Sequence, residues 1–143
     1  TDVAMGSLLG GLCLGPVNTA AVHALAYPLG SDYDVAHGVS NAVLLPHVLE
    51  FNIPSAPERY AAIADALGCT GGGTSTERAV AGVRFLRELN RLCGIPERME
   101  LLGVPRDALE RMAASAMTVQ RLLAQNPREL TLDDARDIYL RAW

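Results

Sequence analysis

The segment over residues 35–51 constrains the fold more than any other, because it is almost continuously apolar. Hydrophobic residues such as Val39, Leu44 and Val48 would cover nearly every side of a helix formed by this segment. A helix of that kind is stable in water only when other helices surround it. Pro46 lies inside the segment and is expected to kink the helix. The chain should therefore pack around a buried central helix.

The rest of the chain also has helical periodicity, and the alternation typical of strands is missing from it. Proline, glycine and asparagine separate the segments, and Pro28 with Gly30 should end the helix before the central one. Residues 30–34 are then expected to form a loop. The sequence predicts an all-α bundle of about seven helices, over residues 2–13, 17–27, 35–51, 58–67, 77–92, 105–116 with a continuation at 118–124, and 132–142.

Composition limits the classes of function. The chain has 143 residues, 50% of them hydrophobic, and a net charge of −4, so it lacks the basic surface needed for nucleic acid or an anionic membrane. No apolar run reaches the roughly 18 residues of a membrane span, and the first residues do not resemble a signal peptide. Three cysteines without a CxxC spacing favour a reducing compartment such as the cytoplasm. The first residue is not Met, and we expect the chain to begin inside a helix of a longer protein.

Three histidines, His23, His37 and His47, are the candidates for chemistry. His23 and His37 would be about 21 Å apart on one continuous helix, too far to share an ion. A chain reversal at Pro28 and Gly30 would instead place them on antiparallel helices about 8–10 Å apart, where both rings could face one point. His47 follows His37 by ten residues on the same helix. It is therefore too distant to join them.

Spacing alone does not favour a metal site. Two histidines in a helical bundle are more often structural than ligating, and a catalytic metal needs three or four protein ligands. Asp32 and Asp34 are near enough in sequence to contribute, although a solvated role in a loop is the expectation. The glycine-rich residues 71–74 lack the lysine and preceding strand of a phosphate loop, and we interpret them as a linker. The residues alone predict a helical bundle with a candidate histidine site.

Longer motifs carry a resemblance to a known family. The stretch HALAYPLGSDYDVAHGVSNAVLLPHVLEFN, residues 23–52, resembles the signature of the iron-containing (group III) alcohol dehydrogenases, in which a histidine, PLG and HGxxNAxLLPxVxxFN follow in order. The last segment, NPRELTLDDARDIYLRAW, is similar to the family's closing NPRxxTxxDxxxxxxxAW. The intervening TSTERAVAGVRFLRELNRLCGIPERMELLGV also resembles the family. The resemblance covers essentially the whole chain.

The resemblance implies a dehydroquinate synthase-like enzyme of two domains. Residues 1–143 would be its C-terminal metal-binding helical domain, and an N-terminal α/β domain absent from this chain would bind NAD(P). One divalent ion, Fe²⁺ or Zn²⁺, would be held by an Asp and three His, the last two of which correspond to His23 and His37. The first two ligands would lie on a DxxxH segment before this chain. Many members have a second histidine where this chain has Tyr27, so Tyr27 becomes the candidate catalytic residue, as a proton relay with an unperturbed pKa of about 10.

The implied function is that of a metal-dependent, NAD(P)-linked alcohol dehydrogenase or aldehyde reductase. The ion would polarise the substrate carbonyl for hydride transfer. A small alcohol or aldehyde, the missing N-terminal domain and further copies of the chain in a homo-oligomer are the expected partners, with neither nucleic acid nor membrane. Without the cofactor domain, the chain alone should be inactive. The alternatives are a maleylacetate reductase or glycerol dehydrogenase-like enzyme, or a non-catalytic helical binding or assembly module, which would not require His23 and His37 to face each other.

Overall fold

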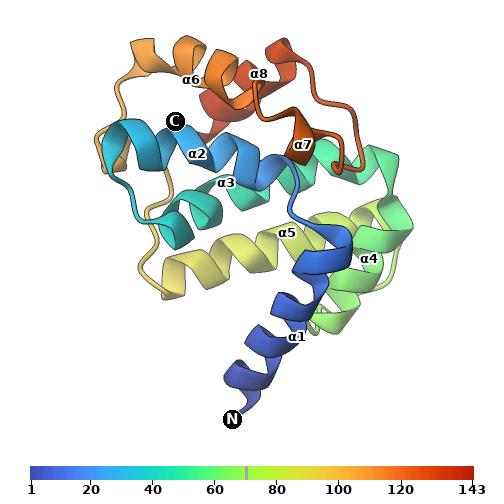
Figure 1. Cartoon of the computed structure of the whole chain (residues 1–143). Coiled ribbons are helices and arrows are strands. Elements are labelled where there is room, and N and C mark those ends of the chain that lie inside the picture. The colour runs from blue at the N-terminus through green and yellow to red at the C-terminus, as the bar shows by residue number, and fades with distance from the viewer. Residues whose placement is uncertain (70) are drawn as a thin grey trace.

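The central element of the structure is α3 (His37–Asn52), formed by the segment that the sequence marks as apolar on most sides. In the computed structural model, α3 packs against α2 (Ala21–Tyr33), α5 (Ser75–Leu92) and α8 (Leu132–Ala142). Figure 1 shows α3 in the middle of the molecule, with α2 and α8 on one side and α5 on the other. The prediction of a buried central helix is confirmed.

The structure describes residues 1–69 and 71–143, and these residues form helices and connecting turns without strands. The all-α fold class is therefore confirmed, with eight α-helices among the described residues where about seven were expected. The remaining elements are α1 (Asp2–Val17), η1 (Ile53–Ser55), α4 (Pro57–Ala66), η2 (Met99–Leu102), η3 (Arg106–Ala108), α6 (Leu109–Ala116) and α7 (Gln120–Leu123).

The second helix differs from its prediction. Pro28 does not end α2, which continues to Tyr33 and includes most of the segment expected to be a loop. Pro28 and Leu29 are buried, so tertiary packing compensates for the hydrogen bond that proline cannot donate. The helix ends instead at Asp34, whose φ of 53° is left-handed, the conformation that commonly terminates helices.

Pro46 likewise removes one backbone hydrogen bond from α3, and a side chain of a neighbouring helix replaces it. A proline at this position has no N–H to donate to the carbonyl of Ala42. The side-chain amide of Asn90 on α5 donates to that carbonyl at 2.7 Å. The backbone gap in the central helix thereby becomes a specific contact between α3 and α5.

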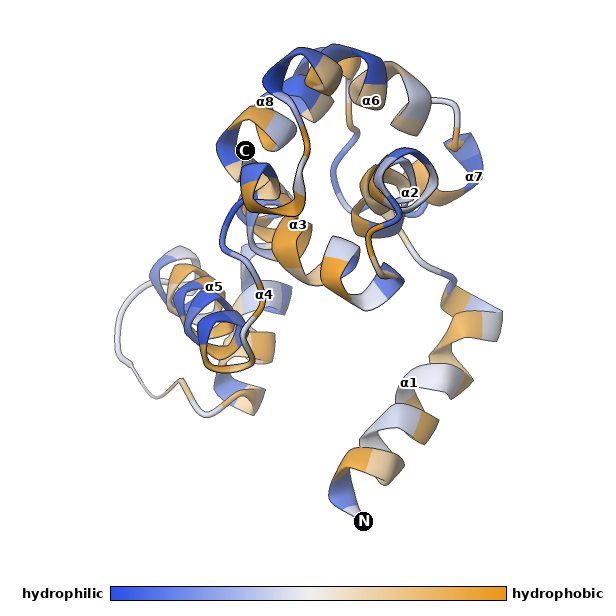
Figure 2. Cartoon of the chain, turned by 90° about the vertical axis from the view of Figure 1, so that its left-hand side faces the viewer, coloured by the Kyte–Doolittle hydropathy of each residue, from blue (hydrophilic) through white to orange (hydrophobic). Residues whose placement is uncertain are grey.

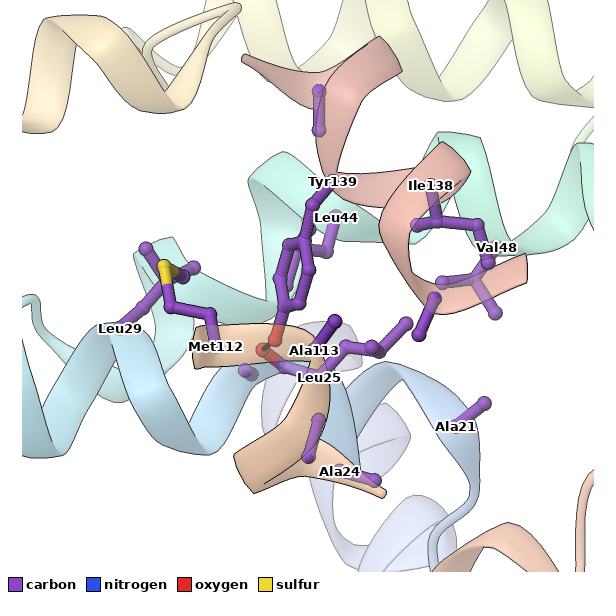
Figure 3. Packing of buried hydrophobic residues seen from close by; sticks show 14 of the residues in the cluster. Ala21, Ala24, Leu25, Leu29, Leu44, Val48, Met112, Ala113, Ile138 and Tyr139 are labelled. Carbon is purple, nitrogen blue, oxygen red and sulfur yellow. Dashed lines mark hydrogen bonds between the residues drawn. The ribbon is translucent and has the colours of Figure 1, made fainter. Parts of the chain in front are cut away.

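The larger core cluster joins α2, α3, α6 and α8. Tyr139 on α8 is fully buried, and its hydroxyl donates to the carbonyl oxygen of Leu25 on α2 at 2.6 Å. Figure 3 shows its ring beside Leu44, with the hydroxyl directed towards Leu25. Burial raises the pKa of the Tyr139 hydroxyl well above its usual range, so this group stays a hydrogen-bond donor. The contact fixes α8 against α2.

A helical hairpin of α4 and α5 forms the other part of the molecule. The two helices approach closely at Gly82, where an added Cβ would lie 2.8 Å from the Cβ of Ala64. The start of α5 is fixed by Thr74 and Glu77, whose side chains each bond the backbone N–H of the other residue in a capping box. Thr74 is therefore the N-cap residue of α5.

The first helix lies apart from this body. Figures 1 and 2 show α1 projecting from the bundle, and none of its residues is buried. No single described helix is long and apolar enough to cross a membrane, although α1 and α2 together pass that test as a pair bent by 103°.

Candidate metal centre

Two histidines, one on α2 and one on α3, lie close together. His23 lies in the first turn of α2, and His37 is the first residue of α3. The reversal between the packed helices brings their ring centroids to 5.2 Å, with the ring planes tilted by 56°. The expectation that both imidazoles lie close together is confirmed, although the reversal follows Asp34 and not Pro28.

This separation suits two ligands of one ion. Imidazoles bound through a nitrogen at about 2.1 Å in a tetrahedral arrangement have ring centroids about 5 Å apart. The observed distance of 5.2 Å matches that arrangement. Among the described residues, no group of three or more His, Cys, Asp or Glu side chains gathers in one place. His23 and His37 therefore fit an ion as part of a ligand set, and the remaining ligands would have to come from elsewhere.

The electrostatic surroundings of His23 favour the form that binds metals. Partial burial, and then the nearby charge of His37, lower the pKa of His23 below its usual value. A lower pKa keeps the ring of His23 neutral at physiological pH. Only the neutral imidazole has a nitrogen lone pair free for a metal.

The turn between the two histidines is held by α6. The guanidinium of Arg111 pairs with Asp32 at 3.1 Å and donates to the hydroxyl of Tyr33 at 3.3 Å. Asp32 is exposed to solvent, as expected, but it lies in the last turn of α2 and not in a loop, and it has a cationic partner. Its bond to Arg111 joins the end of α2 to α6, so it stabilises the geometry that carries His37.

Asn41, one turn after His37, contacts the same histidine. Its amide nitrogen donates to the His37 carbonyl oxygen at 2.8 Å and lies 3.3 Å from Nε2 of the ring. Sequence reasoning did not single out Asn41. Its only signal there was its place in the HGVSNA motif, four residues after His37 and so on the same helix face.

The other two candidates lie in different surroundings. Tyr27 follows His23 by one helical turn on α2 and is 43% exposed, so its hydroxyl is accessible to a ligand or to solvent. His47 is only 5% exposed and faces α5, where its Nε2 lies 3.5 Å from a guanidinium nitrogen of Arg87. His47 takes no part in the pair, as its spacing predicted.

Comparisons with known proteins identify the family of this chain. The model of the family described as "Fe-containing alcohol dehydrogenase family, C-terminal" matches residues 1–143. Long-chain-alcohol dehydrogenase 1 of Geobacillus thermodenitrificans (strain NG80-2) is 42% identical over 145 residues, which are 99% of this chain and 36% of that protein. Lactaldehyde reductase of Escherichia coli (strain K12) is 37% identical over 99% of this chain and 37% of its own length.

Solved structures show the same fold. An alcohol dehydrogenase from Oenococcus oeni superposes with a TM-score of 0.90 at 32% identity, over 94% of this chain and 35% of that one. A 1,3-propanediol oxidoreductase gives a TM-score of 0.84 at 35% identity, over 88% of this chain and 33% of that one. The chain spans little more than a third of the length of these relatives. It belongs to the Fe-containing alcohol dehydrogenase family, of which it is the C-terminal domain.

Proposed function

We propose that this chain is the metal-binding helical part of a metal-dependent, NAD(P)-linked alcohol dehydrogenase or aldehyde reductase. Family membership supports an oxidoreductase, since its relatives include a long-chain-alcohol dehydrogenase, a lactaldehyde reductase and a 1,3-propanediol dehydrogenase. The observation that carries the proposal is the 5.2 Å separation of the His23 and His37 rings. Two imidazoles at that separation are well placed to share a divalent ion.

Each residue has a defined task in this proposal. His23 and His37 hold the ion through ring nitrogens. The first turns of α2 and α3 fix the positions from which the two side chains reach the ion. When bound, a ferrous or zinc ion supplies Lewis acidity that polarises a substrate carbonyl. Tyr27, one turn from His23, donates or accepts the proton at the substrate oxygen. Residues outside 1–143 bind NAD(P) and supply the other metal ligands, so the chain alone does not transfer hydride.

Metal binding can be tested on this chain without measuring activity. Titration with Co²⁺ or Zn²⁺, followed by the ring resonances of the three histidines in NMR, should shift His23 and His37 and leave His47 unchanged. Two ligands give weak affinity, so a Kd on the order of 0.1–1 mM is expected, corresponding to a binding free energy of about 4–5.5 kcal/mol.

Variants at the pair make this test specific. His23→Ala or His37→Ala should weaken the binding at least tenfold, whereas Glu58→Gln on the exposed side of α4 should leave it unchanged. Titration curves that are identical for His37→Ala and the unchanged chain would remove the proposed site. In a longer protein containing this chain, the same His37→Ala change should abolish NAD(P)H-dependent aldehyde reduction.

A further inference from the structure

A cavity of about 330 Å³ opens on another side of α3. It lies between the second half of that helix, α5, the segment 96–98 and α8. Its size is at the lower end of the range for small-molecule pockets. The lining residues are Val43, Pro46, His47, Arg87, Asn90, Pro96, Glu97, Arg98 and Arg141.

Three arginines line the cavity, and they differ in how they are neutralised. Arg87 pairs with Glu50 at 3.0 Å, and Arg98 pairs with Glu100 at 2.9 Å. Arg141 donates to the carbonyl of Asp137 and has no carboxylate partner among the described residues. Arg141 is therefore the one arginine of the cavity without an ion pair among the described residues, although its charge also acts on Asp134.

The carboxylate of Glu97 also lines the cavity, and it limits the charge of a ligand. The guanidinium of Arg141 can neutralise one negative charge of a ligand, whereas the negative charge of Glu97 on the cavity wall disfavours a doubly charged anion such as phosphate. The charges favour a ligand with a single negative charge. A planar carboxylate is the group that a guanidinium binds best, through two parallel hydrogen bonds.

His47 gives the cavity a buried polar side chain. His47 is 5% exposed, and its Nδ1 has no hydrogen-bond partner in the described part of the chain. Burial, and then the guanidinium of Arg87, lower the pKa of this ring, with Glu50 opposing and Arg141 adding to that shift. A neutral imidazole on a cavity wall can donate one hydrogen bond to a ligand oxygen.

The remaining wall is apolar. Val43, Pro46 and Pro96 present hydrocarbon surface to the same space. We propose that this cavity binds a small aliphatic monocarboxylate, with the carboxylate at Arg141 and the aliphatic part against these three residues. The lining lies on α3 beyond the histidine pair, so the proposal does not depend on the metal centre.

The probe for this site is n-butyrate added to the 143-residue chain at constant ionic strength, with chloride as the balancing anion. The expected result is a saturable shift of the His47 ring resonances in NMR, with a Kd on the order of 1 mM. The neutral isostere butyramide should bind at least tenfold more weakly, because it lacks the charge that Arg141 recognises. Inorganic phosphate should also bind more weakly than butyrate.

Variants separate this site from general salt effects. Arg141→Gln should weaken butyrate binding at least tenfold, whereas Arg121→Gln, an exposed arginine on α7, should leave it unchanged. Circular dichroism of both variants establishes that they are folded. Equal shifts for Arg141→Gln and the unchanged chain, or no saturable shift, would overturn the site. Phosphate binding tighter than butyrate would overturn its assignment to monocarboxylates.

Discussion

Asn52 and Asn126 exchange two side-chain hydrogen bonds, at 3.0 Å and 2.8 Å, across 74 positions of the chain. Next to them, Arg128 donates to the carbonyl of Phe51 at 2.9 Å and its guanidinium lies 4.0 Å from the centre of the Phe51 ring. The Phe-Asn end of the first family motif and the Asn-Pro-Arg start of the closing motif are therefore in direct contact. The contact joins the end of α3 to the turn between α7 and α8.

Replacing Asn126 should destabilise the fold through this contact. Asn126→Leu leaves the buried amide of Asn52 without its partner, which should lower the free energy of unfolding by about 1–3 kcal/mol. Urea denaturation measures the change, and Gln125→Leu at the exposed neighbouring position should stay within about 0.5 kcal/mol. Because removing both partners avoids the unpaired amide, Asn52→Leu combined with Asn126→Leu should cost less than the sum of the single changes. Strict additivity would argue against the paired arrangement.

A second prediction concerns Asn90, whose side chain occupies the hydrogen-bonding place that Pro46 cannot fill. Asn90→Leu would leave the Ala42 carbonyl without a donor and should cost about 1–2 kcal/mol of stability. Asn90→Asp should cost more at neutral pH, because a carboxylate would face the carbonyl oxygen. Thermal or urea unfolding of the two variants gives the comparison. If Asn90→Asp were as stable as the unchanged chain, Asn90 would not donate to Ala42.

The fold was largely predictable where the residue pattern of a single segment determines its secondary structure. The apolar segment 35–51 predicted the central helix, and the last helix was predicted at 132–142, the bounds it has in α8. Pro28 was misread as a helix end, because local propensity cannot show that burial compensates for a missing hydrogen bond. Proline and glycine mark probable ends, but tertiary packing decides them.

The candidate site was predictable only in part. The closeness of His23 and His37 followed from the chain reversal and from the family motif. The roles of Arg111 and Asn90 could not be inferred, because their partners lie 79 and 48 positions away and no periodicity marks them. Contacts of that kind depend on how helices dock, and a single sequence does not contain that information.

The stability of the chain should fall in acid because of His47. Burial, and then the nearby guanidinium of Arg87, lower the pKa of His47 to about 4, with Glu50 opposing and Arg141 adding to that shift. On acidification, the imidazole of His47 is therefore protonated near pH 6.5 in the unfolded chain but only near pH 4 in the folded chain. Stability from this group is fully present above pH 6.5 and decreases as the pH falls towards 4, by up to about 3 kcal/mol.

Urea denaturation at intervals between pH 7 and pH 4 would measure this loss. Carboxylates also titrate in that range, so the same series on His47→Gln is the control. The variant should be less stable at pH 7 but should lose less stability on acidification, and the difference between the two slopes isolates His47. Parallel pH profiles would mean that His47 is protonated equally readily in the folded and unfolded chains.

The close approach of α4 and α5 gives a last prediction, at Gly82. Alanine favours a helix over glycine by about 1 kcal/mol, so Gly82→Ala would stabilise an open position. Here the new Cβ would lie 2.8 Å from the Cβ and 3.2 Å from the Cα of Ala64, and the helices must separate. Overpacking of that kind costs about 1–3 kcal/mol, so the net change should be destabilising. Gly6→Ala on α1 has nothing within 4 Å and should be neutral or stabilising, and Ala64→Gly should partly rescue Gly82→Ala in urea denaturation. A stabilising Gly82→Ala would show that the hairpin has room for a methyl group at this point. Glycine would then not be required at position 82 for the contact between α4 and α5.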